Sequence, residues 1–405
     1  MPDVAGPQAA IASGTRGGST KTAGRHTPVP FTDLAAMTGE MWPSIREDYL
    51  ACLLGGGYIG GRPVTAFESR WAAYCGAGHA VGVASGTDAL RLTLTALGIG
   101  AGNEVVVPAN TFIATAAAVA WAGAAPRFAD VSDDTLLMTP RTLAEAITPR
   151  TRAAIVVDLF GQVPDMAGLL AVAGDAGISV VEDAAQAHGA ERDGRRAGSF
   201  GEAACFSFYP AKNLGAFGDA GAVVTSRPEL ADRVRALANH GRPHGAAHCE
   251  HECLGTNSRL DALQAIVLSG KLAHLDAWTR RRIALAARYR NLLGGAGVRL
   301  PGVEPAARHV YHLFVVRVAG RDHVQAELAR RGIQTGVHYP VPCHRQPPLR
   351  RFADRPLPVA ERTAGQLLSL PMFPHMTEGQ VDVVCRALGE VLATAATGPE
   401  LADVW

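Results

Sequence analysis

The sequence predicts an α/β fold in which a large domain with a mostly parallel sheet precedes a smaller α+β domain. Two observations support this prediction. Short apolar runs rich in β-branched residues alternate with alanine-rich helical stretches through the N-terminal part of the chain, which is typical of a parallel sheet with helices on both faces. The length of 405 residues also exceeds the usual size of a single domain.

The large domain is expected over residues 30–275 and the small domain over residues 276–405. Buried strands are predicted at residues 104–108, 153–157, 178–181, 203–207 and 222–225. A long amphipathic stretch at residues 260–293 contains the predicted join between the domains. Beyond the join, residues 309–318 predict a strand and residues 324–331 predict a helix.

The remaining features of composition exclude several function classes. Residues 1–29 are rich in Gly, Ala, Ser and Thr and lack an apolar core, so we expect a disordered arm rather than a signal peptide. The formal net charge of +1 gives no electrostatic footprint for nucleic acid, and no apolar run reaches the roughly 20 residues of a membrane helix. The seven cysteines are odd in number and widely spread, which favours reduced thiols and a cytoplasmic location.

A phosphate-binding turn is predicted at residues 81–90, Val-Gly-Val-Ala-Ser-Gly-Thr-Asp-Ala-Leu. A short apolar strand enters a Ser-Gly-Thr turn, and the residues from Asp88 onward have the apolar spacing of a helix. The backbone amides of Gly86 and Thr87 would then point at an anion on the helix axis. An ordinary N-capped helix contains the same residue types, so this motif needs a second observation.

Asp183 and Lys212 supply that second observation. Asp183 follows a predicted strand, so it lies at a carboxyl end, where α/β folds bind their ligands. A lysine that forms a Schiff base and an aspartate that keeps a pyridine nitrogen protonated are the two groups that pyridoxal phosphate requires. Taken alone, each would more often be a solvated lysine or a capping aspartate. Together with the phosphate-binding turn, the pair predicts a pyridoxal phosphate-dependent aminotransferase.

Two further side chains are expected beside this pair. Gln186 lies three residues after Asp183 and could reach the ring hydroxyl of the cofactor. Ser207 ends a predicted strand, and its hydroxyl could hold a phosphate oxygen while Lys212 reaches the aldehyde carbon.

Two other motifs offer competing interpretations. Residues 55–60 match the spacing G-x-G-x-x-G of a dinucleotide-binding turn, but a helix precedes them instead of the required strand. We therefore expect a flexible glycine turn near the mouth of the site. Residues 244–253 hold three histidines and two cysteines that could bind zinc. Because no second pair follows at finger spacing, a loop without a metal is favoured.

The chain resembles the DegT/DnrJ/EryC1/StrS aminotransferases from about residue 31 to near residue 397. Several motifs carry the resemblance in the order typical of that family: residues 85–90 (SGTDAL), 107–115 (VPANTFIAT), 181–190 (VEDAAQAHGA), 206–215 (FSFYPAKNLG) and 255–261 (GTNSRLD). The resemblance implies the pyridoxal phosphate-dependent transferase fold of the aspartate aminotransferase type, fold type I.

The resemblance also implies a role for each matching residue. Lys212 would form the Schiff base, Asp183 would pair with the pyridine nitrogen, and Gln186 would contact the ring hydroxyl. Contacts to the phosphate and to the ring face are implied for Gly86, Thr87, Ser207 and Phe112. In this family the asparagine that matches Asn257 reaches the phosphate bound in the neighbouring subunit, which implies a homodimer with shared active sites.

The substrate implied by the resemblance is a keto sugar, and the donor is an amino acid, most often L-glutamate. The motifs are similar to those of members that act on dTDP-linked 3-keto-deoxysugars in antibiotic biosynthesis. Lys212 would be displaced by the donor amine, act as the general base on the α-proton, and leave pyridoxamine phosphate for the keto substrate. Substrate contacts are expected from the glycine turn and from two segments near the site mouth, at Tyr58, His240, Arg242, His338 and Tyr339.

Three alternatives to this function remain. A keto-cyclitol could replace the keto sugar, or the chain could be a non-catalytic regulatory member of the family. Sugar dehydratases of the family replace the lysine with histidine, so Lys212 argues against that activity. Asp158 and Phe373 stand where family members commonly have histidine, and both could alter substrate contacts or subunit packing.

Overall fold

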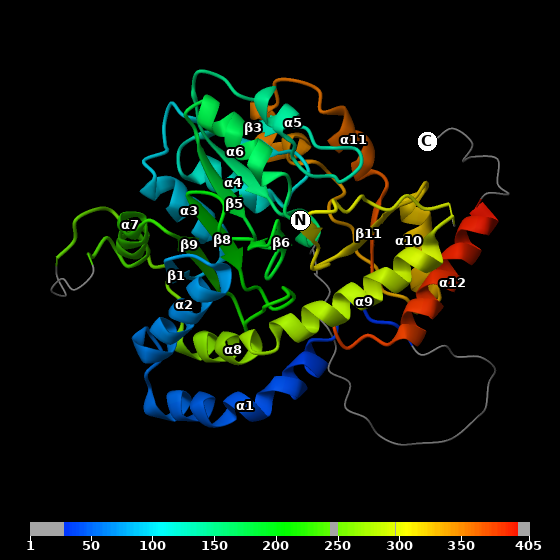
Figure 1. The fold of residues 1–405 in the computed structure, drawn as a ribbon, viewed down its shortest axis with the longest axis horizontal. Helices are drawn as coiled ribbons and strands as arrows, with labels where there is room; N and C mark the ends of the chain where they lie inside the picture. Colours follow the sequence, from blue (N-terminus) through cyan, green and yellow to red (C-terminus); the bar gives the residue numbers. More distant parts are fainter. Residues whose placement is uncertain (1–27, 244–249, 296, 396–405) are drawn as a thin grey trace, which may run out of the picture.

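The computed structural model describes residues 28–243, 250–295 and 297–395. Its centre is a seven-stranded sheet with the strand order β1-β9-β8-β5-β4-β2-β3 (Figure 1). Neighbouring strands are parallel except at β9, which runs antiparallel to both β1 and β8. The strands are β1 (His79–Val83), β2 (Glu104–Pro108), β3 (Ala125–Ala129), β4 (Thr151–Val157), β5 (Ser179–Asp183), β8 (Ala203–Ser207) and β9 (Gly221–Thr225). The prediction of a mostly parallel sheet is confirmed.

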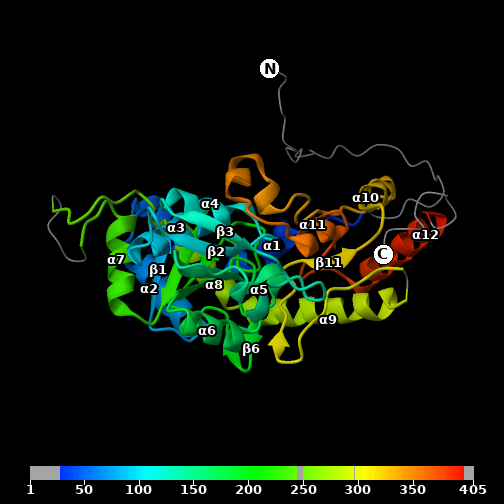
Figure 2. The same ribbon diagram turned by 90° about the horizontal axis from the view of Figure 1, so that it is seen from above.

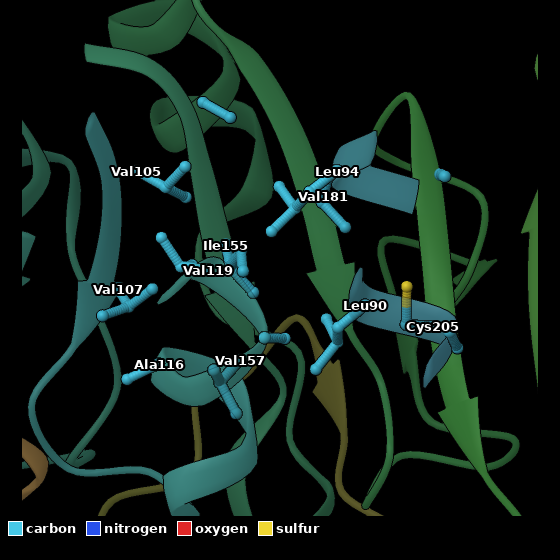
Figure 3. Packing of buried hydrophobic residues seen from close by; sticks show 14 of the residues in the cluster. Leu90, Leu94, Val105, Val107, Ala116, Val119, Ile155, Val157, Val181 and Cys205 are labelled. Atoms are coloured by element: carbon cyan, nitrogen blue, oxygen red, sulfur yellow. The ribbon is translucent and has the colours of Figure 1, made fainter. Parts of the chain in front are cut away.

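Successive residues of a strand point to opposite faces of the sheet. Because both kinds of position are apolar here, both faces of the sheet are buried. Val105 and Val107 of β2 face one side, where they join a cluster with Leu90 and Val119 (Figure 3). Val106 faces the other side and packs in a second cluster. The first side is covered by α3 (Gly86–Ala96), α4 (Ile113–Trp121) and α7 (Pro228–Ala238), and the second by α2 (Gly61–Cys75), α5 (Pro140–Ala144), α6 (Met166–Asp175) and α8 (Ala262–Leu272).

Helix α1 (Leu34–Gly55) lies outside this second layer and packs on α8. Met41 and Ile45 of α1 are buried against Ile266 and Val267. A Cβ atom at Gly270 of α8 would lie 2.3 Å from Ile45 Cγ2. The two helices can therefore approach closely only because α8 has no side chain at that position.

The C-terminal part of the chain forms its own core around a two-stranded antiparallel sheet of β11 (Phe314–Arg317) and β12 (Leu367–Leu370). Figures 1 and 2 show α9 running from the large sheet to the helices of this part. The helices of the C-terminal part are α9 (Leu275–Leu293), α10 (Arg321–Arg330), α11 (Pro358–Ala364) and α12 (Glu378–Ala395), and its short 3₁₀ turns are η2 (Cys343–Arg345) and η3 (Pro347–Phe352). A further 3₁₀ turn, η1 (Leu159–Gly161), follows β4 of the large sheet. A small third sheet joins β6 (Glu191–Arg192), β7 (Arg195–Arg196) and β10 (Ala307–Arg308).

Two predicted elements differ from the structure. The amphipathic stretch at 260–293 is two helices, α8 and α9, which meet at Ala273 and His274. The strand predicted over residues 309–318 is shortened to β11, because Tyr311 adopts a φ of 48° and its backbone N–H donates to His309 Nδ1. This turn interrupts the extended chain before Phe314.

The domain limits at residues 29 and 275 stay predictions. Val29 already belongs to the ordered fold, since it forms a parallel bridge to Ile333. Across the ranges that the structure describes, no helix combines the length and apolar character needed to span a bilayer.

Candidate active site

A cavity of about 490 Å³ opens where β4, β5 and β8 end. Their last residues, Val157, Asp183 and Ser207, line it. Because ligands of open α/β sheets bind at the carboxyl ends of the strands, this is the expected place for an active site. The predicted cofactor residues that line it are Gly86, Thr87, Phe112, Asp183, Gln186, Ser207 and Lys212.

Asp183 is nearly buried, with 6% of its surface exposed. Thr115 Oγ1 donates to its Oδ2 at 2.7 Å, and the backbone N–H of Ala185 donates to Oδ1 at 3.3 Å. Burial raises the pKa of Asp183, whereas these hydrogen bonds and the charge of Lys212 oppose that rise. A cationic N–H group entering the cavity would therefore find a carboxylate whose orientation is already fixed.

Glu182, the neighbour of Asp183, points to the opposite face of the sheet. Its carboxyl group accepts backbone N–H bonds from Gly198, Phe200 and Gly201 at 2.8 to 2.9 Å. Burial raises the pKa of Glu182, and these three N–H donors oppose the rise. Glu182 thus fixes a loop, and of the acidic pair only Asp183 lines the cavity.

Lys212 is held by a tight loop that follows β8. The backbone N–H of Lys212 donates to Tyr209 O, and Ala216 N donates to Phe208 O, each at 2.8 Å. A Cβ atom at Gly215 would lie only 2.2 Å from Pro210 O, so the loop closes because that residue is glycine. Burial lowers the pKa of Lys212 to about 8, although the charge of Asp183 acts in the opposite direction.

The turn before α3 forms an anion cup. Ser85 Oγ caps the helix by accepting from Asp88 N at 3.1 Å, and the first helical turn leaves the N–H groups of Gly86 and Thr87 without an intrahelical acceptor. A Cβ atom at Gly86 would lie 2.7 Å from Ser207 Cβ. The missing side chain therefore lets Ser207 approach, and two N–H groups and one hydroxyl meet at the helix N-terminus, where a phosphate is favoured.

The chain is also similar to proteins of known sequence and structure. A family model described as the DegT/DnrJ/EryC1/StrS aminotransferase family matches residues 42–389. The chain belongs to this family. The fold and the family predicted from the sequence are therefore both confirmed.

Two relatives and two solved structures illustrate the similarity. The dTDP-3-amino-3,4,6-trideoxy-alpha-D-glucose transaminase of Streptomyces venezuelae is 48% identical over 365 residues, which cover 89% of this chain and 96% of that protein. The erythromycin biosynthesis sensory transduction protein EryC1 of Saccharopolyspora erythraea is 46% identical, with 89% and 98% covered. S. venezuelae DesV in complex with a ketimine intermediate superposes with a TM-score of 0.87 at 47% identity, covering 90% and 98%. Bacillus subtilis NtdA with bound cofactor PMP gives 0.84 at 31%, covering 92% and 87%.

The cavity of this family member fits pyridoxal phosphate group by group. Lys212 offers an amine for the aldehyde, Asp183 offers a carboxylate for the ring nitrogen, and the cup at Gly86 offers donors for the phosphate. Gln186 is held on both sides, since its Oε1 accepts from Phe160 N at 2.6 Å and its Nε2 donates to Tyr339 OH at 3.0 Å. The second hydrogen on Nε2 remains for a ring hydroxyl.

Aromatic side chains form the other walls of the cavity. The ring of Phe112 is 53% exposed and lies 5.7 Å from that of Tyr339, tilted by 41°. His338 stacks on Phe31 at 5.9 Å, and its Nδ1 lies 2.8 Å from Ser369 Oγ. Burial lowers the pKa of His338 to about 4, so this ring is neutral.

The structure brings His338 and Tyr339 into the cavity, but not every predicted side chain. Tyr58 is exposed, and its hydroxyl donates back to Leu53 O at the end of α1. His240 lies in a turn with a φ of 60°. The predicted residues outside the set that lines the cavity are Tyr58, His240, Arg242 and Asn257, and their roles stay predictions.

Sequence reasoning assigned no role to several residues that shape this site. His188 is fully buried and its Nε2 lies 2.9 Å from Ser207 O, so it donates to that carbonyl and helps to place Ser207. Burial lowers the pKa of His188 to about 3. Thr115 and His188 both lie within motifs that carried the family resemblance, which was the available signal. His312 and Phe31 had no such signal.

Three of the histidines and cysteines considered as zinc ligands, His244, His248 and Cys249, lie outside the described residues. Within the described ranges no group of three or more potential metal ligands is found. His251 Nδ1 there lies 2.8 Å from His240 O, which is a contact within the loop. The preference for a loop without metal stays a prediction.

Proposed function

We propose that this protein transfers an amino group from L-glutamate to a dTDP-linked 3-keto-deoxysugar with pyridoxal phosphate as cofactor. The observation that carries the proposal is the convergence of Lys212, Asp183 and the anion cup in one cavity. The name of the S. venezuelae transaminase supports the sugar class, because it specifies an amino group at carbon 3 of a dTDP-deoxysugar.

Each residue has a task in this proposal. Pyridoxal phosphate, when bound, supplies an electron sink for the carbon that loses its proton. Lys212 would bind the aldehyde carbon and, once displaced by the donor amine, would accept the α-proton of the donor as a general base and return it, which suits an amine with a pKa of about 8. Asp183 keeps the ring nitrogen protonated, and Thr115 keeps Asp183 in place.

The remaining contacts position the cofactor. The N–H groups of Gly86 and Thr87 and the hydroxyl of Ser207 hold the phosphate, since charge-assisted hydrogen bonds at a helix N-terminus favour an anion. Phe112 would cover the ring face, and Gln186 would donate to the ring hydroxyl. His338 and Tyr339 contact the sugar from the C-terminal part of the chain.

A homodimer with shared sites belongs to the same proposal. Asn257 is exposed and does not line the cavity of its own chain. Leu54 near the end of α1 and Tyr58 and Ile59 of the glycine turn are also exposed, at 85%, 45% and 54%. Such an apolar patch favours burial against a second subunit, where Asn257 would reach the phosphate of the partner.

A cytoplasmic location is also proposed. All six cysteines that the structure describes are free thiols, which suits a reducing compartment.

The absorption spectrum of the purified protein, before and after L-glutamate is added, tests the core of the proposal. We expect the visible band of lysine-bound pyridoxal phosphate, and L-glutamate should convert it to the spectrum of pyridoxamine phosphate. The converted protein is then offered dTDP-linked 3-keto sugars and keto-cyclitols, and return of the visible band identifies the acceptor. A colourless protein that pyridoxal phosphate cannot reconstitute would instead support the regulatory alternative suggested by the name of EryC1.

A further inference from the structure

Asn213 and His312 form a buried polar pair beside the catalytic lysine. Asn213 follows Lys212 directly and is only 2% exposed. Its Nδ2 donates to Val310 O at 3.2 Å, and this bond fixes which end of the amide faces which neighbour. The amide oxygen Oδ1 consequently faces His312, whose Nδ1 lies at 3.3 Å.

This contact determines the tautomer of His312. An amide oxygen can only accept a hydrogen bond, so Nδ1 of His312 must carry the hydrogen. Burial and the positive charge of Lys212 hold the pKa of His312 well below its usual value, so the ring is neutral. A neutral imidazole with its hydrogen on Nδ1 has a free lone pair on Nε2.

The free lone pair belongs to a ring that lines the same cavity as Lys212. In the part of the chain that the structure describes, no protein group donates to His312 Nε2, and Lys212 Nζ has no hydrogen-bond partner. His312 Nε2, which lacks a donor, and the amine of Lys212, which lacks an acceptor, therefore line the same cavity. Asn213, which follows Lys212, orients the His312 ring through its amide oxygen.

We propose that His312 is a positioning residue for Lys212, whose amine donates a hydrogen bond to His312 Nε2 once the donor amine has displaced it from the cofactor. This inference rests on the proposed function. Because the pKa of the imidazole is far below that of an amine, His312 holds the N–H without removing the proton. The lone pair of the neutral Lys212 amine then remains available for the α-proton of the donor.

The groups around His312 keep it neutral. Lys212 comes from the loop after β8, Arg282 from α9, His338 from the segment before η2, and His188 from the segment after β5. Lys212 and Arg282 oppose an imidazolium by their positive charges. The neutral rings of His338 and His188 supply no negative charge that would favour one. Asn213 is the polar contact that a neutral ring needs, and a carboxylate at its position would reverse this balance.

The substitution Asn213→Asp tests how the charge next to His312 sets its protonation state. The new carboxylate would still accept from Nδ1 but would favour the imidazolium and raise the pKa of His312. Below that raised pKa, Nε2 carries a proton and cannot accept. We therefore expect the rates of both half-reactions, with L-glutamate and with the keto sugar, to fall about 10-fold at low pH and to recover as the pH rises. In the wild-type protein the loss of activity on the acidic side should begin at a lower pH than in Asn213→Asp.

His312→Gln should slow both half-reactions about 10-fold at every pH, because both require the free amine of Lys212. His323→Gln is the matched control, since His323 is exposed on α10 and does not line the cavity. Far-UV circular dichroism and Tm establish that each variant folds. A variant that slows only the sugar half-reaction would overturn the proposal, because His312 would then contact the sugar.

A measurement on the unaltered chain tests the tautomer directly. Nitrogen-15 NMR of labelled histidine, assigned by the signal lost in His312→Gln, should find Nδ1 protonated and Nε2 unprotonated. A proton on Nε2 would overturn the inference even if the enzyme is an aminotransferase. If the wild-type protein fails to bind pyridoxal phosphate or to react with L-glutamate, the proposed function fails instead.

Discussion

Thr115 donates its hydroxyl hydrogen to Asp183 Oδ2 over 2.7 Å and so connects α4 to the end of β5. Thr111 Oγ1 lies 2.9 Å from Thr115 Oγ1. Because Thr115 has a single hydroxyl hydrogen, which it gives to Asp183, Thr111 must be the donor of the second bond. Thr111 thus donates to Thr115, and Thr115 donates to Asp183. These hydrogen bonds favour the ionised form of Asp183, which burial disfavours.

Thr115→Val should remove this support and raise the pKa of Asp183 further. Asp183 is useful to the cofactor only when ionised, so activity is lost as the pH falls through its pKa, and the acidic limb of kcat/KM should move to higher pH. A hydrogen bond to a charged group contributes about 1.5–3 kcal/mol, so we expect at least a 10-fold loss near the limb. Thr115→Ser keeps the hydroxyl and should restore the profile. An unchanged limb in Thr115→Val would contradict the role given to Thr115.

Lys212→Ala should abolish turnover and the lysine-linked visible band while the chain still folds. The pH dependence is a sharper test. Burial lowers the pKa of Lys212 to about 8 from the 10.5 of a free lysine, so the nucleophilic amine becomes available as the pH rises through about 8. The rate at which the cofactor-free protein binds pyridoxal phosphate, measured by stopped-flow absorbance, should rise over that range. A rate that increases only near pH 10 would exclude the lowered pKa.

The sequence could predict the half of the site that strands position. Asp183 and Ser207 follow local apolar runs, and a parallel sheet brings the carboxyl ends of such runs together without further information. His312 could not be placed in this way. Residues 309–318 have the composition of one strand, yet the positive φ of Tyr311 interrupts it and His312 enters the cavity.

Residues that depend on tertiary packing escaped prediction for the same reason. Phe31 reaches the cavity only because the chain before α1 crosses to the C-terminal part, where Val29 pairs with Ile333. Tyr58 was placed at the site mouth from its local glycine turn alone. Its hydroxyl bonds to Leu53 O within its own chain, and its role at the site stays a prediction.

Glu182→Gln should destabilise the fold without altering the cavity chemistry. The carboxyl group of Glu182 accepts three backbone N–H bonds. An amide presents N–H hydrogens at one of its two ends, so at least one buried backbone N–H would lose its acceptor, at a cost of about 1–3 kcal/mol. Urea unfolding of the cofactor-free protein measures this loss.

The control for this prediction is Glu191→Gln. Glu191 forms ion pairs with Arg196 and Arg308 that are partly open to solvent. Pairs of this kind contribute only about 0–1 kcal/mol, so this variant should unfold close to the wild-type midpoint. Equal losses in the two variants would mean that the buried N–H contacts of Glu182 do not stabilise the protein.

Mixing two inactive variants tests whether the active sites are shared. If Asn257 serves the neighbouring subunit, a mixed dimer of Lys212→Ala and Asn257→Ala chains has one site in which both residues are altered and one in which both are intact. Activity should therefore appear when the two proteins are unfolded, mixed and refolded together, approaching a quarter of the wild-type value for random pairing. If Asn257 acts within its own chain, every site in the mixture carries one altered residue, and the mixture should be no more active than the average of the two variants refolded separately.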